Sequence, residues 1–463
     1  MSLAAGFSGT ARRLRQLHED PAVVARWQAW TGPLLSRLTP PRRRALLALG
    51  ALYVVVRRPL KEMAPAVDVR APAGPLAGAL VVLLCLVVVA AVYLAARRFA
   101  SLPATVRSRP QLWLHGGFWA IVVLGWLVPD SGGVVALALS GLVLALAFLL
   151  WRMGYLLLSD QRGRMAGTRF SDHLLYLYPA YGGSGVPYGK GLDHLARHEA
   201  TSEEALARSQ LAGLKLLALA AIYHGLLALM AGLVYAESRG PWSVYGLGVP
   251  RVEALLPLGA RAPWAAAWSA LYAGLVWDVL KMAARGHEVV GVLRLFGFNV
   301  FRNTYKPLLA PSLVEFWNRY YYYFKEMLVD FFFFPTYVRC FRGRPALRML
   351  AATLAAAGFG NLYYHIVFND TFLLTLDLAG LRPWLEARAF YCLLLSLGVY
   401  VSMRREQQRR GAAAAATPAS MPTRIRRIAG VWTFFALISI WADVSSATFG
   451  RRVEFFVSLF GLR

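Results

Sequence analysis

The polar groups that could perform chemistry lie in two apolar segments in the second half of the chain. The first segment, residues 297–335, reads GFNVFRNTYKPLLAPSLVEFWNRYYYYFKEMLVDFFFFP. The second, residues 358–370, reads GFGNLYYHIVFND and contains a single histidine, His365. An imidazole ordinarily titrates near neutral pH, so a histidine here could remove a proton from a substrate hydroxyl. A lone histidine on an apolar helix is more often simply packed and hydrogen-bonded, so its position alone does not identify a site.

Charged residues in the first segment argue against contact with lipid. Five polar or charged side chains stand among its aromatic ones: Asn318, Arg319, Lys325, Glu326 and Asp330. A charge at the centre of a bilayer costs about 2.5–3.5 kcal/mol on insertion scales. We therefore expect the segment to lie against other helices or along a wet cavity. Its three prolines favour a re-entrant or interfacial course over one straight span.

The order and spacing of residues in the first segment resemble a motif of the membrane-bound O-acyltransferase (MBOAT) family. The resemblance is strongest to the bacterial branch that acetylates or alanylates polysaccharides. The matching residues are Gly297, Phe298, Asn303, Pro307, Ser312, Glu315, Phe316, Trp317, Arg319, Asp330 and Pro335. In that family a later segment carries the catalytic histidine in a Leu-Trp-His setting. Leu362-Tyr363-Tyr364-His365 resembles it, with one extra residue.

The resemblance implies a fold and a reaction. The fold would be all-α, a polytopic membrane protein with about nine to eleven transmembrane or re-entrant helices. The reaction would move an acyl group, such as acetyl, from acyl-CoA or a carrier-bound thioester to a hydroxyl. That hydroxyl would belong to a polysaccharide, a lipid or a small molecule, and a periplasmic accessory protein would be a further partner. No bound cofactor is expected.

His365 would act as the general base of this reaction. It would take the proton of the acceptor hydroxyl as that oxygen attacks the thioester carbonyl, and no covalent acyl-enzyme would form. The family's second polar position falls on Tyr321, where the Tyr321 hydroxyl or the nearby Asn318 could stand in. The developing negative charge on the carbonyl oxygen needs a hydrogen-bond donor, and Asn318, Tyr321 and Asn361 are the candidates.

Two basic regions could bind the phosphates of the donor. Arg339 and Arg342 belong to a dense basic patch that follows the first segment, and guanidinium groups match phosphate geometry. Lys190 lies in a loop rich in glycine and proline that resembles a family loop near the site entrance. Alternatively, the arginines are charges at the cytoplasmic boundary of the membrane, and Lys190 is a solvated lysine in an ordinary surface loop.

Neither the histidines nor the cysteines indicate a metal site. His194 and His198 are four residues apart and would share a helix face, but a zincin-type site would have a glutamate where Leu195 stands. Three scattered cysteines, two of them in apolar runs, form neither a disulfide framework nor a metal-ligand pattern: Cys85, Cys340 and Cys392. We expect no metal.

Composition places the chain in a membrane. Hydrophobic residues make up 58% of 463 positions, and the mean hydropathy is +0.48. This apolar fraction exceeds that of ordinary soluble domains. The net charge of +26 would suggest nucleic-acid binding in a soluble protein. Here the arginines flank apolar runs, as the positive-inside rule predicts, so no nucleic-acid partner is expected. We therefore expect a multi-pass membrane protein, and the resemblance to the bacterial MBOAT branch implies a bacterial inner membrane.

Apolar runs and basic stretches divide the chain into segments. We expect a cytoplasmic amphipathic or basic N-terminal segment (1–41), a membrane acyltransferase core (42–403), a basic cytoplasmic connector (404–427) and a C-terminal transmembrane helix with a tail (428–463). The N-terminal segment could equally be a disordered basic tail. The predicted spans are 45–56, which is short, 75–96, 112–128, 134–151, 211–236, 262–282, 347–368, 389–403 and 428–447.

Two other functions fit the same membrane setting. A transporter of a polar solute would also need polar groups in its interior, but we find no pair of glycine- or proline-broken helices in matching halves. A catalytically inactive scaffold related to the MBOAT family is the second alternative, because Tyr321 departs from the family pattern.

Overall fold

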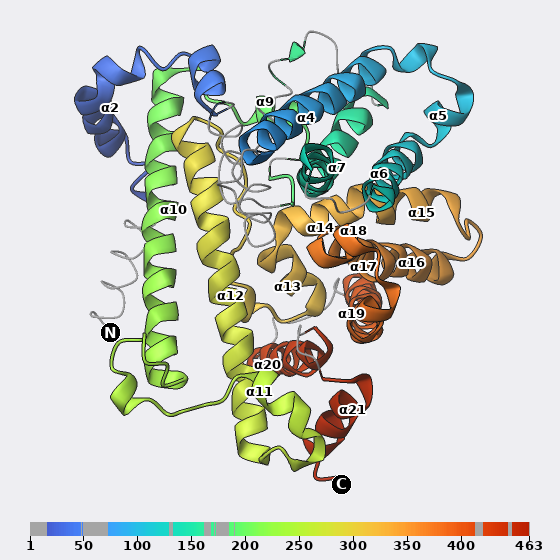
Figure 1. Cartoon of the computed structure of the whole chain (residues 1–463). Helices are drawn as coiled ribbons and strands as arrows, with labels where there is room; N and C mark the ends of the chain where they lie inside the picture. The colour runs from blue at the N-terminus through green and yellow to red at the C-terminus, as the bar shows by residue number, and fades with distance from the viewer. Residues whose placement is uncertain are drawn as a thin grey trace. The chain divides into compact units, whose positions relative to one another are not determined.

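The computed structural model of the chain is all-α, as the sequence predicts (Figure 1). It describes residues 16–47, 49, 73–128, 133–161, 168–170, 172, 185–188, 190–412, 420–442 and 447–462. Within these ranges the only extended pairing is an isolated bridge between Glu199 and Phe298. Most of the short predicted span 45–56 lies outside the described residues.

The chain forms two compact units. Unit 1 comprises Met1–Leu219 and His287–Arg302, and unit 2 comprises Ala220–Gly286 and Asn303–Arg463. Two of the three changes of unit fall inside continuous helices, α10 (Glu203–Leu229) and α12 (Trp264–Leu295), and the third, between Arg302 and Asn303, lies in the loop after α12. The sequence gives no sign of the division, because no linker or change of composition marks it.

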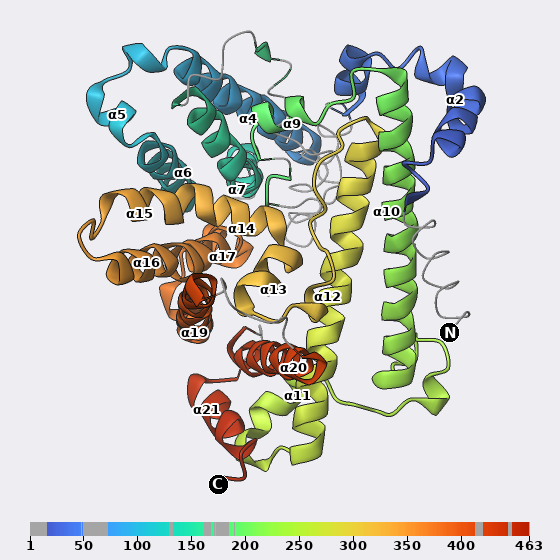
Figure 2. The ribbon, with the colours of Figure 1, turned by 180° about the vertical axis from the view of Figure 1, so that it is seen from behind.

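Unit 1 contains a group of apolar helices packed side by side (Figures 1 and 2). They are α4 (Ala73–Arg97), α6 (Pro110–Leu127) and α7 (Val134–Gln161), and α5 (Ala104–Ser108) connects the first two. α7 contacts both α4 and α6, and most of its residues are buried. A helix that is apolar all round needs such a setting, in a protein core or a membrane.

Four helices of the described part are long and apolar enough to cross a membrane. These stretches are Pro75–Arg97, Val134–Leu158, Glu203–Val234 and Leu378–Arg409. They coincide with or overlap four of the predicted spans. Large apolar side chains are exposed on each of these helices, for example Leu83, Val135, Ile222 and Leu397. The larger number of nine to eleven helices stays a prediction.

The N-terminal part of unit 1 is helical where it is described. α2 (Pro21–Leu35) begins after Asp20, whose carboxylate accepts a hydrogen bond from the backbone N–H of Ala22 at 2.9 Å. Such an N-cap satisfies one of the free N–H groups of a first turn. Buried residues of α2 pack against the start of α10, while Trp30 remains 77% exposed.

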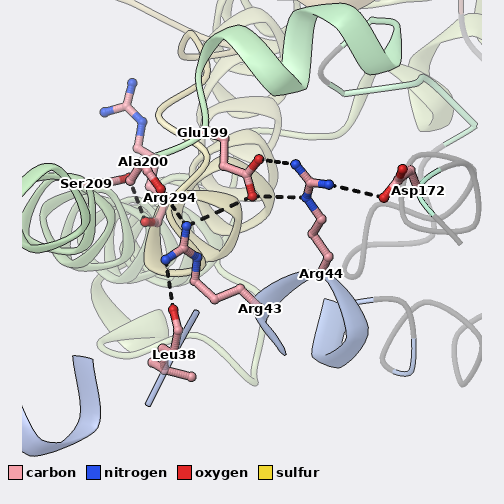
Figure 3. A network of polar contacts seen from close by, with 8 residues as sticks. All are labelled: Leu38, Arg43, Arg44, Asp172, Glu199, Ala200, Ser209 and Arg294. Atoms are coloured by element: carbon pink, nitrogen blue, oxygen red, sulfur yellow. Dashed lines mark hydrogen bonds and ion pairs between the residues drawn. The ribbon is translucent and has the colours of Figure 1, made fainter. Parts of the chain in front are cut away.

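Two adjacent arginines fasten the N-terminal region to the rest of unit 1 (Figure 3). Arg43 is 3% exposed, and its Nη2 donates a hydrogen bond to the backbone oxygen of Ala200 at 2.6 Å. Arg44 donates from Nε to Glu199 Oε1 at 3.1 Å and from Nη1 to Asp172 Oδ1 at 3.1 Å. The N–H of Ala200 in turn donates to the oxygen of Gly297 at 2.8 Å. The arginines therefore stabilise the isolated bridge between Glu199 and Phe298, which lies at the start of residues 297–335.

Unit 2 contains most of residues 297–335 and the helix with His365. Its helical pieces, in chain order after α12, are α13 (Leu313–Tyr320), α14 (Tyr322–Leu328), the π-helix η6 (Val329–Phe333), α15 (Phe334–Arg339), α16 (Pro345–Thr353), the π-helix η7 (Leu354–Gly360), α17 (Asn361–Val367), α18 (Asp370–Thr375), α19 (Leu378–Ala412), α20 (Met421–Ile438) and α21 (Phe449–Ser458). α19 continues past Met403 into the predicted connector 404–427.

The core of unit 2 joins helices that are distant in sequence. Phe316 of α13 is 2% exposed and stacks on Phe435 of α20, with ring centroids 3.9 Å apart. Trp432 of α20 donates a hydrogen bond from Nε1 to the backbone oxygen of Leu308 at 2.8 Å. The first contact fixes the position of α13, and the second fixes the short 3-10 turn Pro307–Leu309 that precedes it. Figure 2 shows α13, α14, α17 and α19 grouped within this unit.

Candidate active site

A cavity of about 250 Å³ lies in unit 2 among α13, α14, η6, η7 and α19, with the first residue of α17 at its wall. Its lining is mostly apolar and includes Val314, Leu328, Phe333, Ala356, Leu395 and Met403. Ligand sites in proteins are typically such apolar cavities with a few polar groups that fix orientation. The polar groups of this cavity come from both segments singled out in the sequence.

Asn318 and Asn361 both line the cavity. Asn318, on α13, is exposed. Asn361, the first residue of α17, is 2% exposed, and its Oδ1 atom has no hydrogen-bond partner among the described residues. Leaving a buried acceptor unsatisfied costs about 1–3 kcal/mol, so the Asn361 oxygen is suited to accept a hydrogen bond from a ligand.

The cavity has further polar groups to which the sequence assigned no role. The Nε1 atom of Trp317 is buried without a hydrogen-bond partner in the described part of the chain, so an N–H donor is available at the wall. The Lys325 ammonium pairs with Glu326 and lies 5.0 Å from the centroid of the Tyr322 ring. In the sequence, a lysine within an aromatic run could have suggested a polar group at a site. Nothing in the sequence indicated that the Trp317 N–H would lack a partner.

Two side chains of α19 hold the first turn of α13. The Ser312 hydroxyl accepts a hydrogen bond from the N–H of Glu315 at 3.1 Å and donates one to Glu406 at 2.5 Å. Ser402 accepts from the N–H of Val314 at 3.4 Å. These contacts satisfy the free N–H groups of the helix start, and they set the position of Asn318 one turn further along.

The boundary between α13 and α14 is fixed by Asn303. Tyr321 leaves the helical conformation, with φ −140° and ψ 70°. Asn303 is 1% exposed, and it accepts hydrogen bonds from the next two backbone N–H groups. Its backbone oxygen accepts from Tyr322 at 3.0 Å, and its side-chain oxygen accepts from Tyr323 at 3.3 Å. The break therefore keeps its backbone groups satisfied inside the unit.

Two π-helical stretches, η6 and η7, contact each other at the cavity. The contact is close because Gly360 has no side chain: a Cβ atom there would lie 2.6 Å from the ring of Phe332. Short π-helical insertions are rare and often occur at functional sites. Here they wall the cavity and lead directly into α17.

His365 lies on α17, four residues after Asn361, and is half-buried. Residues four apart share a helix face, so His365 continues the face of Asn361, but it does not line the cavity itself. A series of ring contacts connects it to the first segment. The His365 ring contacts Tyr364 at 5.5 Å between centroids, Tyr364 contacts Phe324 at 4.8 Å, and Phe324 stacks on Tyr321 at 5.2 Å.

The predicted phosphate-binding residues are not at the cavity. Arg339 ends α15 and Arg342 follows it; both are exposed, and Arg342 donates from Nε to the oxygen of Val338 at 3.0 Å. Lys190 belongs to unit 1, where its backbone is left-handed with φ 54°. The structure therefore brings Asn318, Tyr321 and His365 into one unit and leaves Arg339 and Arg342 on that unit's surface.

His194 and His198 lie side by side in unit 1. Their ring centroids are 4.3 Å apart, and Phe301 contacts both rings. Burial, together with the neighbouring His198, Lys190 and Arg197, lowers the pKa of His194 to about 4. Over the described residues, no group of three or more His, Cys, Asp or Glu side chains could hold a metal ion.

Comparisons with known proteins add no relative. No protein-family model matches the chain, and no curated protein matches it.

Proposed function

We propose that the protein is a membrane-embedded O-acyltransferase that transfers an acyl group from a thioester donor to a hydroxyl, with His365 as general base. The observation that carries this proposal is the shared cavity of Asn318 and Asn361. It supports a common role for the two segments whose residues resemble the MBOAT family.

The reaction requires one proton transfer in each direction. His365 takes the proton of the acceptor hydroxyl, and the oxygen attacks the carbonyl carbon of the thioester. The carbon–sulfur bond then breaks, and the leaving thiolate takes the proton from the imidazolium. Negative charge develops on the carbonyl oxygen in between and must be stabilised by hydrogen bonds.

The polar groups around the cavity suit this requirement. The exposed amide of Asn318 supplies N–H donors at the cavity wall, and the buried Nε1–H of Trp317, another lining residue, is a further donor without a partner among the described residues. The unsatisfied oxygen of Asn361 accepts a hydrogen bond, which suits an approaching hydroxyl. The Tyr321 hydroxyl remains a candidate donor on the His365 side.

The apolar part of the cavity suits the hydrocarbon part of the donor. Its volume of about 250 Å³ is several times the space of about 30 Å³ that a single water takes in the liquid. Because His365 lies one helical turn beyond Asn361, the acyl chain would occupy the cavity and the acceptor would approach from the His365 side. Arg339 and Arg342, on the surface of the same unit, are the proposed contacts of the donor's phosphates.

The setting of the reaction follows from the apolar helices. Four helices that can cross a membrane support a multi-pass protein of a bacterial inner membrane, with the other spans predicted from sequence completing the core. Donor thioester on the cytoplasmic side and acceptor hydroxyl on the other would then meet at His365.

The proposal is tested by comparing envelope polymers and lipids from cells with and without the protein by mass spectrometry. We expect the cells without the protein to lack one acyl mass on a hydroxyl-bearing product, and plasmid-borne wild-type protein to restore it. Identical acylation in both would contradict the proposal.

A further inference from the structure

A loop of unit 2 presents large apolar side chains outward. It joins α10 to α11 (Val252–Leu255) and can be followed in Figure 1. Trp242, Val244, Tyr245 and Leu247 are 63%, 91%, 79% and 79% exposed. Single exposed apolar residues are ordinary, but a contiguous group marks an interaction surface. We call residues 242–247 the apolar tip.

The loop that carries the apolar tip has a defined conformation. Two ladder-like hydrogen bonds attach it to the π-helix η2 (Met230–Val234), which continues α10: Leu247 N–H to Leu233 oxygen at 2.8 Å, and Val249 N–H to Val234 oxygen at 2.9 Å. The backbone passes very close to Gly232, where a Cβ atom would lie 1.9 Å from the oxygen of Pro241. Only glycine fits this approach.

The base of the loop is closed by Arg251. Its guanidinium lies between two rings, 3.6 Å from the centroid of Tyr235 and 4.1 Å from that of Trp277. The same side chain pairs with Glu237 at 2.6 Å. The guanidinium of Arg251 is therefore engaged by these two rings and by Glu237. The large side chains of the apolar tip remain exposed.

Three features identify lipid as the partner of this tip. The membrane-crossing stretch of α10 ends at Val234, so the loop emerges where the bilayer surface would be. Ile222 is 56% exposed on the same helix, and the apolar surface therefore continues toward the loop. Tryptophan and tyrosine prefer the membrane–water interface, and the exposed Arg239 can contact headgroup phosphates.

We propose that the apolar tip inserts into the interfacial layer of the bilayer that α10 crosses. The loop thereby anchors unit 2 at one membrane surface in addition to its spanning helices. This inference rests on the proposed membrane setting, and it is independent of the acyl transfer reaction.

The test is photo-crosslinking of the full-length protein in liposomes of phosphatidylethanolamine and phosphatidylglycerol. The photoreactive residue p-benzoylphenylalanine is placed in separate variants at Val244 in the tip, at Ile222 on the span, and at Glu253, an exposed acidic residue just beyond the loop. Lipid adducts are measured by mass spectrometry. Because all three positions are exposed, folding is checked simply by size-exclusion chromatography.

We expect lipid adducts at Ile222 and Val244, with at least a tenfold lower yield at Glu253. Adducts at Ile222 without adducts at Val244 would overturn the tip insertion and leave the span intact. Equal yields at Val244 and Glu253 would also overturn it. If neither Ile222 nor Val244 forms an adduct, the membrane setting itself is rejected, and this inference with it.

Discussion

Asn318 of α13 and Asn361 of α17 line one cavity, although they come from separate segments of the chain. The Asn361 oxygen is buried there without a partner among the described residues. The unsatisfied oxygen weakens the folded state. A ligand that donates a hydrogen bond to it would remove this cost, so the stability of the fold is linked to the proposed function.

Replacing Asn361 with leucine separates the two effects. The Asn361→Leu variant removes an unsatisfied buried oxygen, so we expect the free energy of unfolding to stay unchanged or rise by up to about 1 kcal/mol. Acyl transfer should fall by about tenfold or more, the value of one lost hydrogen bond. Denaturant unfolding and transfer of labelled acyl groups in membranes measure both.

Ser396→Ala is the matched control for this variant. Ser396 is fully buried on α19, but its hydroxyl already donates to the oxygen of Cys392 at 2.6 Å, and it does not line the cavity. The acyl-transfer activity of Ser396→Ala should stay at the wild-type level. Full activity in Asn361→Leu would contradict a role of the Asn361 oxygen in ligand binding.

Filling the cavity should change the preference for acyl chain length. Ala357→Phe places a ring in the cavity, so we expect a larger loss of rate with octanoyl-CoA than with acetyl-CoA. Ala355→Phe changes the neighbouring π-helical turn without lining the cavity and should leave the ratio of the two rates unchanged. Rates measured with both donors in both variants provide the check, and equal losses for both donors in Ala357→Phe would count against the cavity as the acyl site.

The sequence predicted the composition of the site better than its arrangement. The all-α fold and the apolar helices follow from long apolar runs, which are local properties of the chain. The approach of Asn361 to Asn318 depends instead on contacts between distant segments, such as Phe316 on Phe435. A local pattern does not contain such contacts. His365 could be named from its motif, but its place one turn beyond the cavity could not.

Two other features had no sequence signal. The π-helical form of residues 354–360 ends at Gly360, which packs closely against Phe332, a contact that only the folded unit defines. Two of the three boundaries between the units fall inside α10 and α12, where helix propensity is continuous. Arg43 and Arg44 fall at the start of the predicted membrane core (42–403), where the sequence assigned them no role, and the structure gives them specific partners.

Removing Arg44 should destabilise unit 1. The Glu199 side chain is 6% exposed and would lose its closest cation, whereas the Arg44 side chain is 34% exposed and partly screened by solvent. We therefore expect Arg44→Ala to cost about 2 kcal/mol, between the values typical of exposed and buried ion pairs. Thermal unfolding in detergent measures the loss.

The exposed pair of Arg382 and Glu386 is the control for Arg44. Its side chains are 79% and 46% exposed and screened by solvent, so Arg382→Ala should leave stability nearly unchanged. Equal effects of Arg44→Ala and Arg382→Ala would show that the contacts of Figure 3 do not stabilise the unit.

The buried His194 predicts a pH dependence of stability. Its pKa is lowered to about 4, mainly by burial, so between about pH 6.5 and 4 the unfolded chain binds a proton that the folded chain does not. The contribution of neutral His194 to the free energy of unfolding should therefore be fully present above pH 6.5 and decrease as the pH is lowered toward 4. The melting temperature of the wild type should drop more between pH 7 and pH 4.5 than that of His194→Gln. An equal drop in both proteins would contradict the assignment.

The central claim is that His365 moves the proton in acyl transfer, and one measurement tests it directly. Membranes with wild-type protein, His365→Ala or His224→Ala, which changes a histidine on α10, are given labelled acyl-CoA, and the label on hydroxyl acceptors is followed over time. We predict that His365→Ala lowers the rate by about 100-fold to 10,000-fold at equal protein level, while His224→Ala keeps the wild-type rate. Undiminished transfer by His365→Ala would contradict the account.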